Sequence, residues 1–124
     1  LLQDKKIPLH GDGSNIRTYI YADDFSSALE TAFNKGKAGE IYNIGTKDER
    51  SNLEIAKLLA KKLGKDESCI EMVKDRPFND KRYSIDIEKL SRLGWKQKHG
   101  FETALDETIG WYKKNEEWWK DKVK

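Results

Sequence analysis

The stretch HGDGSNIRTYIYADDF, residues 10–25, contains a turn, an extended segment and the beginning of a helix. Its two glycines can adopt positive backbone φ angles at little cost, so Gly11–Ser14 is predicted to be a turn. Residues Thr18–Tyr21 alternate as a strand does. Asp23 and Asp24 follow, and aspartate is a preferred N-terminal cap of a helix. The stretch therefore predicts a chain in which strands and helices alternate closely.

The segments on either side extend this alternation. Upstream, Lys6–His10 is predicted to be extended, because Pro8 is incompatible with a helix interior. The helix that begins at Asp23 carries apolar residues at helical spacing and is predicted to end at Gly36. The later predicted elements are a strand at Ile41–Gly45, a helix capped by Ser51 or Asn52 and stopped by Gly64, a strand at Ile70–Val73, a polar loop over Arg76–Tyr83, a helix at Ile87–Leu93 and a last helix from near Phe101. This mixed order favours an α/β or an α+β fold.

At 124 residues the chain has the size of one domain or of part of a larger one, and its composition excludes several classes of protein. Hydrophobic residues make up 36% and charged residues 37%, with a net charge of only +2. Acidic residues are interspersed with basic ones, whereas a nucleic-acid-binding surface usually carries a clustered basic stripe. No apolar run approaches the roughly 20 residues that cross a bilayer. The composition therefore predicts neither a nucleic-acid partner nor a membrane partner.

The chain contains a single cysteine, Cys69, which cannot form an internal disulfide. This fits a reducing compartment and predicts a cytoplasmic protein. A lone cysteine is usually a small buried apolar residue, and no histidine pattern around Cys69 indicates an activated nucleophile.

The first residues, Leu1-Leu2-Gln3, include no initiator methionine, and all four tryptophans lie in the last third of the chain. Bulky aromatic side chains normally seek burial. We therefore expect the chain to be a segment of a longer polypeptide, with a further domain that covers part of its aromatic surface. The four tryptophans are Trp95, Trp111, Trp118 and Trp119.

The sequence contains no recognisable catalytic constellation. It has no G-x-G-x-x-G turn, no phosphate-binding P-loop and no G-x-S-x-G nucleophile motif. His10 and His99 lie far apart, and neither belongs to a metal-ligand pattern. For Asp23 and Asp24 a capping role is preferred over a catalytic one. We therefore predict neither a catalytic residue nor a metal site in these 124 residues.

Two loops are better suited to binding. In Gly11–Arg17, the glycines let a ligand approach the backbone and the arginine offers a planar fork of donors. The second loop, DRPFNDKRY at residues 75–83, concentrates polar side chains, and guanidinium forks suit the oxygens of a diphosphate. Asn52, at a helix start, could both cap the helix and reach a phosphate. The alternative interpretation is a solvated surface loop with ordinary ion pairs. The polar residues of the second loop are Arg76, Asn79, Lys81, Arg82 and Tyr83, with Asp75 and Asp80 to orient them.

Four stretches, in order, resemble the C-terminal part of nucleotide-sugar 4,6-dehydratases, which are extended short-chain dehydrogenase/reductase enzymes. They are PLHGDGSNIRTYIYADDFSSALE, GEIYNIGT, DRPFNDKRYSIDIEKLSRLGW and TIGWYKKNEEWW. The resemblance points in particular to the UDP-glucose 4,6-dehydratase region of rhamnose-synthesis enzymes, and then to the dTDP-glucose 4,6-dehydratases. The most specific part is R-P-x-N-D-x-R-Y, since related epimerases and decarboxylases usually have a G-D pair after R-P and lack the R-Y.

The resemblance implies both a fold and an activity. The fold would be α/β, a C-terminal substrate-binding lobe plus the last elements of an extended Rossmann fold, incomplete without its upstream half. The family converts a nucleoside-diphosphate glucose to the 4-keto-6-deoxy sugar, with NAD bound by the upstream half taking hydride from C4 and returning it to C6. The resemblance further implies a homodimer of the full-length enzyme.

The resemblance assigns binding roles to several residues. Arg17 and Arg76 match arginines that grip the diphosphate, and Asn52 matches an asparagine on the phosphate side. Asn79 stands where the dTDP enzymes tend to have histidine, and agrees with the UDP-type pattern. Pro8 and His10 match the extended segment against the nucleobase, and Arg82 and Tyr83 belong to the signature without an individual role.

The family's catalytic residues do not occur in this chain. Its glycine-rich NAD turn, its Tyr-x-x-x-Lys pair and its Asp-Glu pair are absent, and neither Tyr42 nor Tyr112 is followed four residues later by lysine. The isolated chain is therefore expected to be inactive. Two alternatives stay open: a lobe of a nucleotide-sugar 4-epimerase or decarboxylase, and a non-enzymatic module that binds a protein through its charged surface and Trp118-Trp119.

Overall fold

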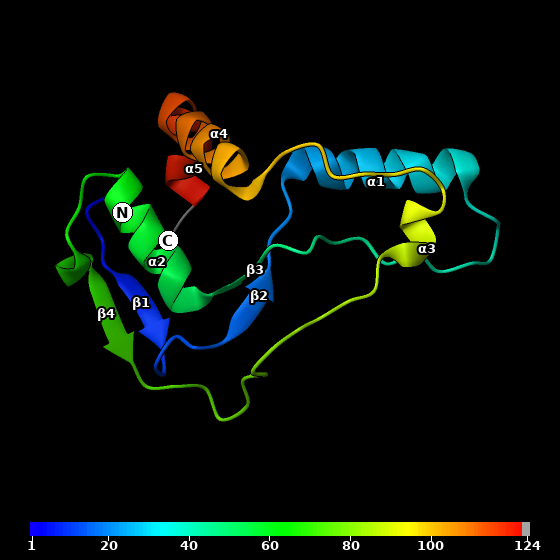
Figure 1. Cartoon of the computed structure of the whole chain (residues 1–124). Helices are drawn as coiled ribbons and strands as arrows, with labels where there is room; N and C mark the ends of the chain where they lie inside the picture. The colour runs from blue at the N-terminus through cyan, green and yellow to red at the C-terminus, as the bar shows by residue number, and fades with distance from the viewer. Residues whose placement is uncertain (123–124) are drawn as a thin grey trace.

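A computed structural model describes residues 1–122 and shows helices and short strands in mixed order (Figure 1). The strands form two small sheets: β1 pairs with β4 in parallel, and β2 pairs with β3 in antiparallel orientation. The strands are β1 (Ile7–His10), β2 (Ile16–Thr18), β3 (Glu49–Ser51) and β4 (Ile70–Val73). The helices are α1 (Ala22–Lys35), α2 (Asn52–Lys62), α3 (Glu88–Ser91), α4 (Phe101–Lys114) and α5 (Glu116–Trp119), with 3-10 turns η1 (Glu67–Cys69) and η2 (Lys120–Lys122).

The elements gather into two groups that extended segments connect. In Figure 1, α2, α4 and α5 lie near β1 and β4, whereas α1 and α3 lie together on the other side. The second group encloses a core of Ala28, Leu90 and Trp95. Trp95 donates its indole N–H to Ser27 Oγ at 3.0 Å, which satisfies the polar atom of a buried ring.

The predicted start of α2 is confirmed in detail. Ser51 is the N-cap: its hydroxyl accepts from the backbone N–H of Glu54, and the Glu54 carboxylate accepts from the backbone N–H of Ser51. This reciprocal pair is a capping box. At the other end Gly64 has a φ of +68°, the left-handed conformation expected just after a helix. Asn52 is the first helical residue.

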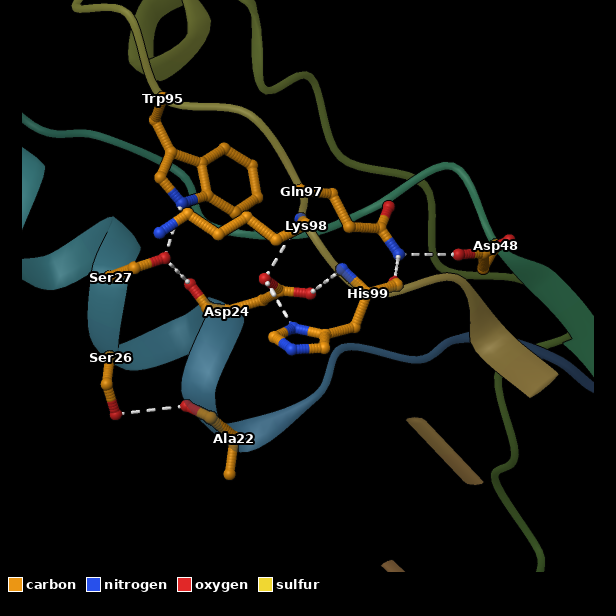
Figure 2. A network of polar contacts seen from close by, with 9 residues as sticks. All are labelled: Ala22, Asp24, Ser26, Ser27, Asp48, Trp95, Gln97, Lys98 and His99. Atoms are coloured by element: carbon orange, nitrogen blue, oxygen red, sulfur yellow. Dashed lines mark hydrogen bonds and ion pairs between the residues drawn. The ribbon is translucent and has the colours of Figure 1, made fainter. Parts of the chain in front are cut away.

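The prediction that Asp23 or Asp24 caps α1 is wrong. The N-cap is Tyr21, which makes no side-chain capping bond, and both aspartates lie inside the first turn. Asp24 is fully buried, and its carboxylate is bonded to Lys98 and His99 in the segment that precedes α4 (Figure 2). A carboxylate in the first turn still interacts favourably with the helix dipole.

Two strand predictions also need correction. Residues 41–45, a predicted strand, belong to no strand in the described part of the chain, and Ile41 is 81% exposed. The strand predicted at Thr18–Tyr21 is instead Ile16–Thr18. Its partner β3, with the sequence ERS, was not predicted because it has neither the alternation nor the β-branched residues on which strand prediction depends.

Candidate functional site

The 75–83 loop is fastened along β2. The backbone N–H of Ile16 donates to the carbonyl of Lys81 at 2.8 Å, and Ile16 and Arg82 form a parallel bridge. β2 therefore lies between β3 and residues 81–82. The buried side chain of Asn15 strengthens this attachment, since its Nδ2 donates to the carbonyl of Asp80 at 3.1 Å.

Arg17 projects from β2 towards this loop. Its Nη1 donates to the carbonyl of Ile16 at 2.7 Å, and its Nη2 donates to Asn79 Oδ1 at 3.2 Å. The guanidinium carbon lies 4.5 Å from the centre of the Tyr83 ring, a cation–π arrangement. These contacts fix the plane of the guanidinium and use only part of its donors, so the group can still bind an anion.

Asn79 connects the two arginines that were predicted to bind a diphosphate. Its Oδ1 accepts from Arg17 and, at 3.5 Å, from Arg76 Nη2. Its Nδ2 donates to Asp75 Oδ1 at 2.8 Å. The hydrogen bonds from the Asn79 side chain and the Arg76 backbone N–H lower the pKa of Asp75 below its ordinary value. Asp75 thus stays ionised and holds the Asn79 amide with its oxygen towards the arginines.

Two contacts hold Tyr83, one at its hydroxyl and one at the face of its ring. The hydroxyl donates to Asp80 Oδ2, and the ring face meets Arg17. The hydrogen bond to Asp80, with the charge of that carboxylate, raises the pKa of Tyr83. Tyr83 is therefore a neutral hydrogen-bond donor over the physiological pH range.

Arg82, which precedes Tyr83, contacts Glu49 instead of Arg17 or Asn79. Arg82 donates from Nε and Nη2 to the two carboxylate oxygens of Glu49, at 3.0 and 2.8 Å. Glu49 lies in β3, so this ion pair reaches across β2. No sequence signal pointed to Glu49, because its strand was not predicted.

The other predicted binding residues lie around this cluster. His10, at the end of β1, has Nδ1 3.2 Å from the carbonyl of Lys74, immediately before the loop. The backbone N–H of Asn52 donates to the carbonyl of Asn15 at 3.0 Å, which places the start of α2 beside β2. Arg17, Arg76, Asn79 and Tyr83 together form what we call the arginine cluster. Pro8 is exposed in β1, and no contact described within residues 1–122 joins it to this cluster. The structure thus brings together Arg17, Arg76, Asn79 and Tyr83, and leaves Pro8 apart.

The arginine cluster lies on an open surface rather than in an enclosed cavity. An apolar cavity of about 620 Å³ lies elsewhere, between the first residues of the chain, α2 and α4. A second cavity, of about 320 Å³, lies between the segment after β2 and α4. Neither is lined by Arg17 or by the 75–83 loop.

Asp24 is the centre of a second polar cluster (Figure 2). Its carboxylate accepts from the backbone N–H groups of Lys98 and His99, at 3.0 and 3.1 Å, and lies 3.1 Å from His99 Nδ1. Burial raises the pKa of Asp24, but these hydrogen bonds outweigh burial and leave the pKa below its ordinary value. The described contacts satisfy this carboxylate with backbone and histidine donors, so the cluster joins α1 to the segment before α4.

Two further properties concern residues 1–122 as a whole. None of the helices there combines the length and the apolar character that crossing a membrane requires. In the same described range, no three histidine, cysteine, aspartate or glutamate side chains converge in a way that could hold a metal ion.

Comparison with known proteins places this geometry in context. The family model described as GDP-mannose 4,6 dehydratase matches residues 1–108. The chain is 46% identical over 121 residues to a trifunctional UDP-glucose 4,6-dehydratase/UDP-4-keto-6-deoxy-D-glucose 3,5-epimerase/UDP-4-keto-L-rhamnose-reductase of Arabidopsis thaliana, an alignment that covers 97% of this chain and 18% of that protein. It is 42% identical over 125 residues to dTDP-glucose 4,6-dehydratase 1 of Escherichia coli strain K12, covering 94% of this chain and 35% of that protein.

A solved structure has a similar fold. The crystal structure of dTDP-glucose 4,6-dehydratase from Bacillus anthracis in complex with NAD superposes on this chain with a TM-score of 0.89 at 44% identity. The match covers 97% of this chain and 38% of that one. The chain therefore spans between 18% and 38% of the length of these three proteins.

Proposed function

The chain belongs to the GDP-mannose 4,6 dehydratase family, and from this we propose that it forms the nucleotide-sugar-binding part of an NAD-dependent 4,6-dehydratase. The resemblance inferred from the sequence motifs is confirmed, and so is the fold class, part of an α/β Rossmann-type architecture. The proposed full-length enzyme converts UDP-glucose or dTDP-glucose to the 4-keto-6-deoxy sugar, a step towards rhamnose. It is proposed to be a cytoplasmic homodimer.

The observation that carries the proposal is the convergence of Arg17 and Arg76 on Asn79, beside the ring of Tyr83. A diphosphate presents several anionic oxygens in a small volume, and two guanidinium forks on adjacent segments match it with charge-assisted hydrogen bonds. The neighbouring carboxylates of Asp75 and Asp80 are engaged by Asn79 and Tyr83, so they orient donors. Asn52 on the phosphate side, and His10 and Pro8 near the nucleobase, are proposed as further contacts.

We propose that NAD is not bound by the residues described here. They include no glycine-rich turn between a strand and a helix, and the N-cap of α2 is already occupied by the Ser51–Glu54 capping box. NAD supplies hydride chemistry, and we assign its binding to the upstream half of the full-length enzyme. What these residues contribute is the binding and orientation of the nucleotide sugar.

A product assay tests the proposed function. The full-length enzyme is incubated with NAD and either UDP-glucose or dTDP-glucose, and the products are identified by NMR. A 4-keto-6-deoxy sugar is the expected product, and the preferred substrate identifies the nucleobase. A C4 epimer or a pentose would instead favour an epimerase or a decarboxylase. The 124-residue chain alone serves as the control and is expected to give no product, because no proton-transfer tyrosine or NAD turn is present.

A non-enzymatic module makes a different prediction from the same protein. Such a module would give no sugar product, would not bind UDP or dTDP, and would bind another protein instead. Calorimetric titration with UDP and dTDP therefore separates this alternative from every enzymatic one.

A further inference from the structure

The ion pair between Glu49 and Arg82 crosses the strand that carries Arg17. We propose that these two residues form a clamp that positions Tyr83 against the guanidinium of Arg17, so that Arg82 is a positioning residue and does not itself bind the diphosphate. This inference rests on the proposed function, because it assigns roles within the same nucleotide-sugar site.

The strand register gives the clamp its geometry. Glu49 is paired with Thr18 across the β2–β3 ladder, whereas Arg82 is bridged to Ile16 on the other edge of β2. Because the two side chains bond to each other, they must both lie on the same face of β2 and reach across that strand. The contact uses both carboxylate oxygens and two guanidinium nitrogens, which fixes the relative orientation of the two groups as well as their distance.

The clamp acts on Arg17 through Tyr83. Tyr83 follows Arg82 directly in the chain, so a fixed Arg82 restricts where the tyrosine ring can lie. The ring then rests 4.5 Å from the Arg17 guanidinium carbon, and its hydroxyl is tied to Asp80. Arg17 is consequently held between the Tyr83 ring and the Asn79 amide oxygen before any ligand binds. Such preorganisation reduces the entropy that binding would otherwise cost.

The same contacts make Arg82 unsuitable as a diphosphate ligand. Its Nε and Nη2, the edge that would form a bidentate pair with a phosphate, are engaged by Glu49, and the carboxylate neutralises its charge. To bind the diphosphate with this edge, Arg82 would have to leave Glu49, a half-buried carboxylate whose side chain is 28% exposed. Arg17 and Arg76 have no carboxylate on their forks among the described ion pairs of residues 1–122.

The experiment measures UDP affinity by calorimetry, and KM and kcat for the nucleotide sugar, in the full-length enzyme. Glu49→Gln and Arg82→Gln each remove the clamp, and Arg17→Ala removes the proposed ligand. Glu88→Gln is the matched control, since it removes the partner of another Arg–Glu pair, Arg92–Glu88, whose two side chains are exposed. Each clamp variant is expected to weaken UDP binding and raise KM about fivefold, the scale of one net hydrogen bond, with kcat little changed.

The double variant Glu49→Gln/Arg82→Gln distinguishes a clamp from a ligand. A clamp predicts that the double variant binds UDP no more weakly than either single variant, because both changes break one pair. If Arg82 contacted the diphosphate, Arg82→Gln would weaken binding well beyond Glu49→Gln, and the clamp would be rejected. The clamp would also be rejected if Glu49→Gln matched Glu88→Gln.

The proposed function can fail separately. The proposed site would be rejected if the wild-type enzyme bound neither UDP nor dTDP, or if Arg17→Ala bound UDP as tightly as the wild type does. If Arg17→Ala weakened UDP binding while the clamp variants bound UDP normally, only the clamp would be rejected.

Discussion

In the proposed site, the contacts of Arg17 orient a charged side chain of a strand for an anion. Its contacts are to a carbonyl oxygen, an amide oxygen and the face of a ring, none of which carries a full negative charge. The guanidinium is thus fixed in direction without being neutralised. This distinguishes it from Arg82, whose charge is matched by Glu49.

Replacing Arg17 with alanine in the full-length enzyme is expected to weaken nucleotide-sugar binding by about 1.5–3 kcal/mol, the usual value of a hydrogen bond to a charged group. Bound NAD is expected to be unaffected, because Arg17 is assigned to the substrate diphosphate. Titration with UDP measures the first quantity, and the NAD content of the purified enzyme measures the second. Arg17→Lys is the control that keeps the charge but loses the fork, and it should recover only part of the affinity. If Arg17→Ala bound UDP as tightly as the wild type, Arg17 would have no role in substrate binding and would be an ordinary surface residue.

Asp24 offers a prediction about stability instead of binding. Its pKa lies below the ordinary value of 3.8, so the folded chain binds this proton less readily than the unfolded chain does. The carboxylate therefore stabilises the fold above about pH 4, and this contribution is lost as the pH falls through the folded-state pKa. Asp24→Ala leaves two backbone N–H groups without their acceptor and is expected to cost about 3 kcal/mol of unfolding free energy at neutral pH.

Urea denaturation of the full-length enzyme at pH 7 and near pH 3.5 measures this effect. The difference between wild type and Asp24→Ala should shrink at the lower pH. Asp23→Ala is the control, since Asp23 lies on the exposed side of the same helix turn. A difference that is the same at both pH values would show that the Asp24 charge does not contribute.

The residues of the site could be predicted to different extents. Arg17, Arg76 and Asn79 could be proposed from the sequence because their own side chains carry the chemistry. Arg76 and Asn79 belong to a motif with fixed spacing, and Arg17 follows a glycine turn. Glu49 and Asn15 could not be found, because their roles come from partners more than 30 residues away, at Arg82 and Asp80. Such contacts depend on which strands pair and in which register, and the chemistry of the individual residues does not predict that.

The helices were more predictable than the strands, for a physical reason. A helix satisfies its backbone within its own segment, so caps such as Ser51 and stops such as Gly64 are local signals. A strand needs a neighbour. Residues 41–45 have strand-like composition, but in the described chain they pair with no strand, whereas the polar β3 is a strand because β2 lies beside it.

The capping box at α2 leads to a prediction for that helix. Ser51→Ala removes the hydroxyl that accepts from the N–H of Glu54 and is expected to cost about 1 kcal/mol of unfolding free energy. Ser26→Ala is the matched control, because that exposed serine bonds only back to the carbonyl of Ala22 within α1. Urea denaturation compares the two variants. Equal stability of the two would mean that the capping box contributes nothing.

Within residues 1–122, many large apolar side chains lie exposed, whereas the buried core is small. Ala28 on α1 packs into the core, but Phe25, Leu29 and Phe33, four residues apart, lie exposed on the same helix. Phe33 is 89% exposed. Of the four tryptophans, Trp95 and Trp119 are buried, whereas Trp111 and Trp118 are exposed. Apolar residues at this spacing form a continuous stripe along one helix face.

The isolated chain is therefore expected to self-associate or to be only marginally stable. A contiguous exposed apolar patch drives association, and a short chain buries a smaller share of its surface. We propose that α1 and residues 41–44 pack on the upstream half in the full-length enzyme, which the isolated chain lacks. Light scattering on the purified 124-residue chain should show oligomers, and hydrogen exchange should show weak protection in this region. Leu29→Glu/Phe33→Glu should reduce the association, whereas Phe78→Glu, at an equally exposed loop position, should not. A monodisperse wild-type monomer with strong protection at residues 28–44 would mean that the chain folds as an independent domain, and that the stripe on α1 needs no partner.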